Sequence, residues 1–374
     1  MGASTLYDKN TSVKPRIAVI GCKGLPAFGG SARVVESLIH KLHGSYDFTV
    51  YALSSHANQN GIYDECPQIV LKKLRHKKLS TLFYYFKATL HCLFVGNYDI
   101  VHVHHIDAAF IIPLLKLKYK VISTSHGITF KADKWSSTEK AFFRLMEIIY
   151  LKCPAHAMTT VAKSIQEQYQ KRTKRHVHYI PNAVETDHGE LPAISHQGYI
   201  FFAAGRILRI KGLHTLLQAL GKMQFDGKII VAGDLNQDQE YKKRIERLSE
   251  GLPVTFTGLI KDQALLMSYI EHAQLFVFPS TLEAMSSMLL EAASLDTPIV
   301  CSDIPENMDV FSDDEVLLFK NDNAEDLQQK LEWALDHPEE MAQKAKQARK
   351  KLAEVFNWDV VAAQYDHLYK RMLP

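Results

Sequence analysis

Cysteine pairs, metal-binding motifs and long apolar runs are missing from this chain of 374 residues. Its five cysteines are odd in number and widely spaced, with no Cys-x-x-Cys pair. We therefore expect a reducing, cytoplasmic compartment, and we expect neither a disulfide framework nor a zinc site. The longest apolar runs, such as 108–115, are too short to cross a bilayer, and the first ten residues are polar. The sequence thus predicts neither a membrane span nor a signal peptide.

The charge is nearly balanced overall but unevenly distributed. The net charge is +3, yet residues 1–190 carry 25 Lys and Arg against 14 Asp and Glu, and the remainder carries 19 against 27. Much of the positive excess lies at 71–78 and 171–175. This asymmetry predicts that the N-terminal half meets an anionic ligand or an anionic membrane surface, with a pair of solvated loops as the alternative. No nucleic-acid-binding motif accompanies the charge, so we expect no nucleic acid as a partner.

Apolar periodicity predicts alternating strands and helices. Residues 16–21 form an apolar run that ends in glycine, a glycine-rich loop follows, and 31–42 has apolar residues at helical spacing. After a polar stretch at 181–198 the pattern restarts. We predict further strands at 48–52, 100–103, 121–125, 199–204, 228–232, 254–257, 275–278 and 298–301, and further helices at 213–223, 239–248, 287–295, 324–335, 339–356 and 358–373.

Continuous apolar strands between helices indicate parallel sheets that are covered on both faces. We therefore predict an α/β fold of two Rossmann-like doubly wound domains facing a central cleft, with domains at 1–190 and 191–355 and a helical segment at 356–374 that crosses back to the first domain. A ligand would bind in the cleft, at the carboxyl ends of the strands.

A basic loop follows the first strand of the second domain. Gly205 to Gly212 contains Arg206 and Lys211 just ahead of a helix. An arginine can hold two phosphate oxygens at once, and a lysine adds a mobile point charge. The loop is either a phosphate-binding element or an ordinary exposed basic loop.

Two glutamates flank the start of a later helix. Glu283 is expected in the preceding loop, while Ser286 or Ser287 would cap a helix that carries Glu291. The first backbone N–H groups of such a helix bind anions, and carboxylates accept bonds from hydroxyl groups. An anion together with hydroxyls describes a nucleotide sugar. The alternative is a capping acid and an unrelated surface glutamate.

These features together resemble the retaining family 4 glycosyltransferases of the B-type two-domain fold, with bacterial rhamnosyltransferase-like members nearest. The resemblance extends over nearly the whole chain. It includes the loop 23–30, the segment Ser125-His126-Gly127 with Trp135, the linker 180–184 and the loop 302–307. Where the family often reads Glu-Gly-Phe-Gly, this chain reads Glu-Ala-Met-Ser at 283–286, so the donor sugar stays open.

The resemblance implies an acceptor-binding N-terminal domain and a nucleotide-sugar-binding C-terminal domain. It assigns the diphosphate to Arg206 and Lys211, the ribose hydroxyls to Glu291, hydroxyls of the donor sugar to Glu283, and the transferred sugar to His126. It also assigns the donor's sugar and phosphate to backbone groups of Gly29, Gly30, Ser286, Ser287 and Met288.

The implied reaction moves a sugar, with retention, from a nucleoside-diphosphate sugar to a glycan or lipid-linked acceptor, in bacterial surface polysaccharide synthesis. UDP is the first expectation for the nucleotide, with GDP or dTDP possible. The chain has no Asp-x-Asp motif, and two cations plus a helix terminus can balance a diphosphate, so we expect no metal and no other cofactor. The histidines at 102, 104 and 105 are not expected to bind zinc. The acceptor's proton goes either to the leaving phosphate or to His126, whose ordinary pKa would suit a general base.

Three other functions could use a similar fold. A nucleotide-sugar epimerase would share the diphosphate site, and a non-catalytic nucleotide-binding protein would use most of the same residues. A dinucleotide-dependent dehydrogenase is disfavoured, because the first turn reads Gly21-Cys22-Lys23-Gly24 in place of Gly-x-Gly-x-x-Gly.

Overall fold

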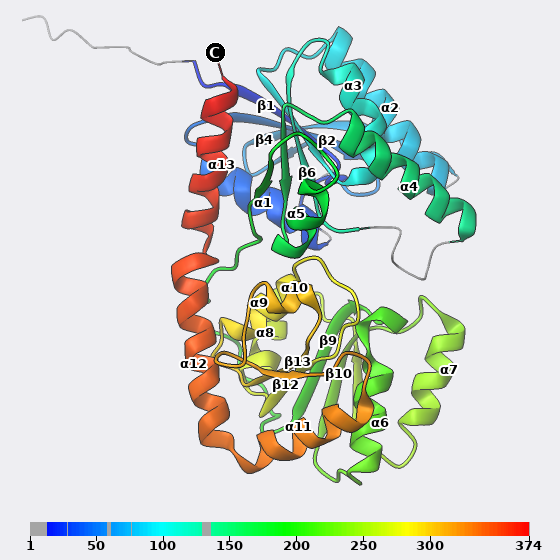
Figure 1. The fold of residues 1–374 in the computed structure, drawn as a ribbon, viewed down its shortest axis with the longest axis vertical. Helices are drawn as coiled ribbons and strands as arrows, with labels where there is room; N and C mark the ends of the chain where they lie inside the picture. The colour runs from blue at the N-terminus through cyan, green and yellow to red at the C-terminus, as the bar shows by residue number, and fades with distance from the viewer. Residues whose placement is uncertain (1–12, 28, 58–60, 76, 129–135, 374) are drawn as a thin grey trace, which may run out of the picture.

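The computed structural model describes residues 13–27, 29–57, 61–75, 77–128 and 136–373. These residues form two lobes, one above the other, each built around a β-sheet with helices on both faces (Figure 1). The fold is therefore the predicted pair of Rossmann-like α/β domains.

The N-terminal lobe contains an eight-stranded sheet in the order β3-β4-β2-β1-β5-β6-β7-β8. All neighbouring strands are parallel except β3 and β4. The bounds are β1 Arg16–Ile20, β2 Asp47–Leu53, β3 Ile62–Tyr63, β4 Cys66–Leu71, β5 Ile100–His104, β6 Lys120–Ser125, β7 Ala157–Thr160 and β8 Val177–Tyr179.

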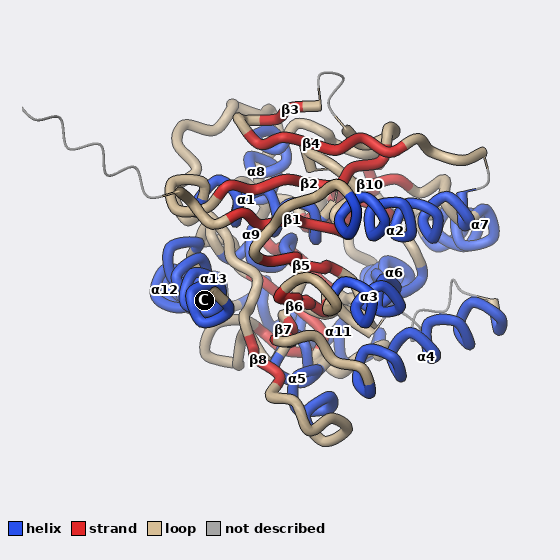
Figure 2. The backbone as a smooth tube through the Cα atoms, turned by 90° about the horizontal axis from the view of Figure 1, so that it is seen from above, coloured by secondary structure: helices blue, strands red, loops and turns tan. Residues whose placement is uncertain are grey.

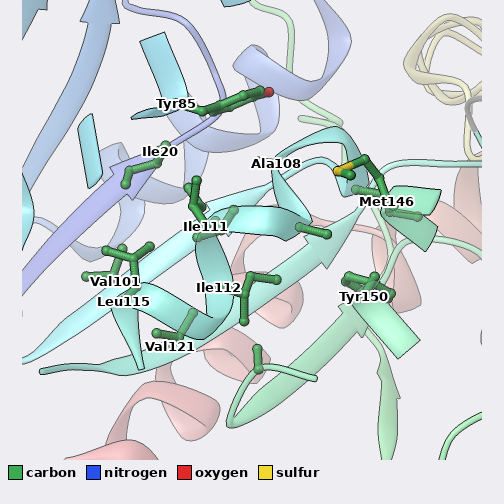
Figure 3. Packing of buried hydrophobic residues seen from close by; sticks show 14 of the residues in the cluster. Ile20, Tyr85, Val101, Ala108, Ile111, Ile112, Leu115, Val121, Met146 and Tyr150 are labelled. Atoms are coloured by element: carbon green, nitrogen blue, oxygen red, sulfur yellow. The ribbon is translucent and has the colours of Figure 1, made fainter. Parts of the chain in front are cut away.

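Helices cover both faces of this sheet, as the view from above shows (Figure 2). They are α1 Gly30–Leu42, α2 Lys77–Phe94, the 3₁₀ helix η1 Ile106–Ile111, α3 Ile112–Leu115, α4 Ser137–Lys152 and α5 Lys163–Gln170. One core packs α2, η1 and α4 against the sheet, and Figure 3 shows Tyr85, Ile111 and Met146 in it. A second core lies on the α1 face.

The C-terminal lobe contains a parallel six-stranded sheet in the order β11-β10-β9-β12-β13-β14. This is the order of the dinucleotide-binding doubly wound fold. Its strands are β9 Ile200–Arg206, β10 Ile229–Asp234, β11 Val254–Gly258, β12 Leu275–Phe278, β13 Ile299–Ser302 and β14 Leu317–Phe319. Its helices are the 3₁₀ turn η3 Arg209–Lys211, α6 Leu213–Lys222, α7 Gln239–Leu248, α8 Gln263–Glu271, α9 Ser287–Ala293, α10 Pro305–Met308, α11 Ala324–Asp336 and α12 Pro338–Val355.

The last helix, α13 (Trp358–Met372), packs on the N-terminal lobe although it follows a helix of the other lobe. In Figure 1, α12 runs beside the lower lobe and α13 continues beside the upper one. Tyr365 and Tyr369 are fully buried against the α1 face of the sheet, and the Tyr46 hydroxyl donates to the Asp366 carboxylate at 2.7 Å. The C-terminal segment therefore ties the two lobes together. The boundaries 1–190, 191–355 and 356–374 remain a prediction from the sequence.

Several predicted element ends differ from the structure by one or two residues. Strand β9 continues through Arg206 instead of ending at 204, because Arg206 still pairs with Asp234 of β10. Helix α9 ends at Ala293, two residues earlier than predicted. Among the described residues, no helix is long and apolar enough to span a bilayer.

Candidate active site

The strand order reverses at one place in each sheet, and these two places face each other. The reversals lie between β1 and β5 and between β9 and β12, where doubly wound sheets bind ligands beyond the carboxyl ends of their strands. Arg33 of α1 reaches across the lobes, with its Nη1 2.9 Å from Glu291 Oε1 of α9. A Cβ atom added at Gly127 would lie 3.2 Å from the Ala284 Cβ atom. The predicted site residues of both lobes therefore border one interface.

The loop after β9 is held against the loop after β12. Gly212 adopts a left-handed conformation (φ +69°), and any Cβ atom there would overlap the Pro279 carbonyl oxygen, so only glycine fits. The Thr281 amide donates to the Ile210 carbonyl oxygen at 2.8 Å. As a result Lys211 Nζ lies 2.5 Å from Glu283 Oε1, and 24% and 11% of these side chains are exposed. Because an ammonium carries three donors, Lys211 can hold this carboxylate and a phosphate together.

Arg206 is the last residue of β9 and its side chain is exposed. It takes part in none of the salt bridges found within the described ranges. Its guanidinium is therefore accessible to an anionic ligand at the carboxyl edge of the sheet.

Glu291 is buried and only half satisfied. Its Oε1 accepts from Arg33 at 2.9 Å and from Gln263 Nε2 at 3.1 Å. Its Oε2 is buried and has no hydrogen-bond partner among the described residues. Burial raises the pKa of this carboxyl, and the nearby Arg33 opposes that shift. A buried oxygen without a partner costs stability unless a ligand supplies one, and a ribose hydroxyl is a suitable donor.

Helix α9 begins as the sequence suggested, but without a side-chain cap. Ser286 occupies the N-cap position and makes no capping hydrogen bond. Ser286, Ser287 and Met288 are all half-buried. The loop before the helix is fixed from the linker, because the Asn182 Nδ2 donates to the Met285 carbonyl oxygen at 2.9 Å.

The two glycines at the start of α1 have space around their Cα atoms. A Cβ atom on Gly29 would meet nothing within 4 Å, and one on Gly30 would lie 3.8 Å from Ser287 Oγ. Packing among the described residues therefore does not require these two glycines. Trp135, part of the segment quoted with His126, lies outside the described residues.

His126 belongs to a cluster of histidines at the carboxyl ends of β5 and β6. Its Nε2 lies 2.9 Å from His104 Nδ1, and the two rings are stacked with centroids 5.2 Å apart. The ring of His105 lies 5.1 Å away, and His105 Nε2 is 2.8 Å from Ser31 Oγ. Burial, reinforced by His105 and His102, lowers the pKa of His126 well below its usual value. The expectation of an ordinary pKa was wrong, so His126 is neutral near pH 7 and a weak base.

The hydrogen bond to His104 also orients the His126 proton. His104 Nε2 is buried without a partner among the described atoms. An orphaned acceptor is tolerated better than an orphaned N–H group, which favours His104 donating through Nδ1. His126 then accepts at Nε2 and carries its proton on Nδ1. This arrangement suits a hydrogen-bond donor to a sugar and does not suit a general base.

His102, the last histidine of this cluster, is fully buried in the core. It lies between Tyr369 and Thr124, with ring nitrogens 2.8 and 2.7 Å from their hydroxyl oxygens, and burial lowers its pKa to about 3. Within the part of the chain that the structure describes, no group of three or more His, Cys, Asp or Glu residues could hold a metal ion.

Arg33, Gln263 and His104 were not among the residues predicted for the site. The sequence does contain a feature that could have predicted Arg33 as a site residue, because it is a cation in the first turn of the helix that follows the Gly29-Gly30 loop. Gln263, the first residue of α8, has no comparable feature in the sequence. In the sequence, His104 is marked only as one of three neighbouring histidines, at 102, 104 and 105.

Two Rossmann-like lobes with facing strand reversals are typical of glycosyltransferases of the B-type fold, and the comparison with known proteins supports this class. Residues 28–188 match the family model described as Glycosyltransferase Family 4, and residues 186–351 match the one described as Glycosyl transferases group 1. The chain belongs to the B-type glycosyltransferases.

Individual relatives are distant. The chain is 26% identical over 257 residues to the 2-deoxystreptamine N-acetyl-D-glucosaminyltransferase of Niallia circulans, an alignment that covers 60% of this chain and 64% of the relative. The chain spans 55% of another curated relative, an uncharacterized glycosyltransferase of Methanocaldococcus jannaschii, with 24% identity. The chain thus spans less than two thirds of the length of these two curated relatives.

Solved structures share the whole fold. Sucrose-phosphate synthase from Thermosynechococcus elongatus superposes with a TM-score of 0.81 at 22% identity, covering 96% of this chain and 99% of that one. HepE of Anabaena in complex with UDP-glucose has a TM-score of 0.77 at 16% identity, covering 95% and 99%.

Proposed function

We propose that this protein is a retaining, metal-independent glycosyltransferase that moves a sugar from a nucleoside-diphosphate sugar to a glycan or lipid-linked acceptor. The main support is the buried Oε2 atom of Glu291, which has no hydrogen-bond partner among the described residues and lies at the interface of the two lobes. A hydroxyl group of a bound ligand would supply the missing donor. Synthesis of bacterial surface polysaccharide, on the cytoplasmic side of the membrane, is the proposed setting and rests on the resemblance.

The cations of the site suit the charge that the reaction develops. When the bond from the sugar's anomeric carbon to the diphosphate breaks, positive charge grows on the sugar and negative charge grows on the phosphate. Arg206 and Lys211 would stabilise the leaving diphosphate, and fixed charges of this kind act most strongly where charge develops. Glu283, paired with Lys211 at 2.5 Å, would contact donor-sugar hydroxyls.

The proton of the acceptor hydroxyl needs a destination. The lowered pKa of His126 argues against that histidine as the base. We propose that the acceptor oxygen attacks from the same face and that its proton passes to the departing phosphate oxygen. His126 would position the transferred sugar through a hydrogen bond from Nδ1.

A thermal-shift screen tests the donor. UDP and UDP-sugars are expected to raise the melting temperature, with GDP- and dTDP-sugars as the other candidates; the HepE complex with UDP-glucose supports beginning with uridine. A ligand at 100 times its dissociation constant stabilises the native state by about 2.7 kcal/mol. If no nucleoside diphosphate or nucleotide sugar shifts the melting curve, the proposed site is wrong.

Chelation tests metal independence. Because Arg206 and Lys211 supply the positive charge, EDTA is expected to leave the initial rate of transfer unchanged, and added Mg²⁺ or Mn²⁺ should not raise it. A rate that falls with EDTA and returns with either metal would contradict this assignment.

The comparisons do not favour an epimerase, since both matching family models describe glycosyl transferases. A non-catalytic nucleotide-binding protein would bind the same ligand without turnover. Release of the nucleoside diphosphate that depends on an added acceptor distinguishes the transferase from both alternatives.

A further inference from the structure

Helix α2 is apolar on two opposite faces. Its inner face buries Tyr84, Tyr85, Ala88 and Cys92 in the core. A second row points to solvent at helical spacing, with exposed fractions of 56% for Leu79, 48% for Phe86, 37% for Leu90 and 81% for Phe94. The core does not account for this outer row, which we call the α2 stripe.

The α2 stripe continues into a groove shared with α4. The groove has a volume of about 520 Å³ and eight lining residues, all of them apolar: Leu74, Leu79, Leu82, Phe83, Phe86, Phe110, Phe142 and Met146. On α4, Leu145 and Ile148 are also exposed, at 52% and 49%. Both helices lie on the same side of the N-terminal lobe (Figures 1 and 2). A continuous apolar surface of this kind marks an interaction site.

Positive charge borders the α2 side of this surface. Residues 71–96 contain six Lys and Arg and no Asp or Glu. Lys72, Lys73 and Arg75 are exposed next to Leu74 of the groove, and Lys87 lies over the Phe83 ring at 4.6 Å. On α4, the buried Glu147 pairs with Arg172 at 2.8 Å, and Glu139 accepts from the Ser136 amide at 3.0 Å at the start of the helix.

We propose that the α2–α4 surface docks on an anionic lipid bilayer. The α2 stripe would enter the boundary between headgroups and acyl chains, while the flanking cations contact lipid phosphates, the arrangement typical of interfacial helices. A second copy of the chain is a poorer occupant, because a symmetric contact would bring two clusters of the same charge together. Since α4 follows the segment that carries His126, docking would hold the proposed active site near lipid-linked acceptors, and only this consequence rests on the proposed function.

The test is co-sedimentation of the full chain with vesicles, without nucleotide. Binding is expected with vesicles that contain phosphatidylglycerol, with little binding to pure phosphatidylcholine and a decrease at high salt. The pair Phe86→Ser and Phe94→Ser is expected to lower binding by at least about tenfold. The pair Lys72→Gln and Lys73→Gln is expected to lower it by about 30-fold.

Matched control pairs change similar residues elsewhere. Met308→Ser with Val355→Ser replaces apolar residues that are 50% and 45% exposed in the C-terminal lobe. Lys346→Gln with Lys350→Gln replaces exposed lysines of α12. Both control pairs should bind vesicles as the unaltered chain does.

The proposal is overturned if the chain does not bind vesicles, or if the test and control pairs behave alike. Self-association that only the Phe86 and Phe94 changes relieve, measured by light scattering, would assign the surface to a second copy and also overturn it. The nucleotide thermal shift is recorded on the same variants. Loss of vesicle binding with an intact thermal shift supports the proposal, whereas vesicle binding without any shift counts only against the proposed function.

Discussion

Arg206→Ala is expected to lower the rate of sugar transfer by about 10²–10³-fold, by analogy with the loss of one preorganised donor to a developing anion. Arg206 is exposed at the end of β9 and has no salt bridge among the described residues, so its removal should not change the free energy of unfolding appreciably. The measurement is the initial rate of nucleoside diphosphate release, with the donor from the thermal-shift screen and an acceptor.

Arg209→Ala is the matched control. Arg209 is an exposed cation of the same loop, but its guanidinium lies 6.0 Å from the centre of the Tyr241 ring, toward α7. We expect nearly unchanged transfer. Arg206→Lys should recover only part of the rate, because lysine cannot hold two phosphate oxygens in a planar fork. Equal rates for Arg206→Ala and Arg209→Ala would remove Arg206 from the site.

Glu291→Gln is expected to weaken the binding of a nucleoside diphosphate by roughly 10- to 100-fold, because hydrogen bonds to a charged group contribute about 1.5–3 kcal/mol. The amide keeps the shape of the side chain but offers one acceptor oxygen instead of two. Since burial raises the pKa of Glu291, the ionised form opposes folding. A neutral glutamine should therefore leave the melting temperature of the free protein unchanged or higher. Isothermal titration calorimetry measures the affinity.

Deoxynucleotides make this prediction specific to the ribose. If Glu291 binds a ribose hydroxyl, removing that hydroxyl from the ligand and changing Glu291 to Gln abolish the same hydrogen bond. The losses of binding free energy from the two changes should then be smaller together than their sum. The 2′-deoxy and 3′-deoxy diphosphates are each titrated against both proteins. Fully additive losses for both ligands would show that Glu291 does not contact the ribose. Glu354→Gln, an exposed position on α12, controls for loss of charge.

The fold could be predicted because its signal is local. Apolar spacing in 31–42 and 239–248 placed helices α1 and α7, and continuous apolar runs placed β1, β5 and β12. Helix α2 was not predicted, because apolar residues on both of its faces blur the periodic contrast. Short strands such as β14, with three residues, are too brief to show a period.

The site divides in the same way. The residue types of the Arg206–Gly212 loop and of the Glu283–Glu291 segment already indicated phosphate and hydroxyl binding, since that chemistry belongs to single side chains. The contacts between Arg33 and Glu291 and between His104 and His126 join residues that are 258 and 22 positions apart. Spacing within a short segment of the sequence cannot predict contacts between residues so far apart.

The sequence by itself determined the α/β class and the repeat of the Rossmann-like pattern, and it predicted which residues bind phosphate, because each depends on spacing within a few turns or on the nature of one side chain. Tertiary structure alone decided that Lys211 pairs with Glu283, that one Glu291 oxygen is buried without a partner, that His126 is a weak base and that the α2 stripe faces solvent. These properties follow from burial and from proximity between distant segments, and the packing of the two lobes sets both.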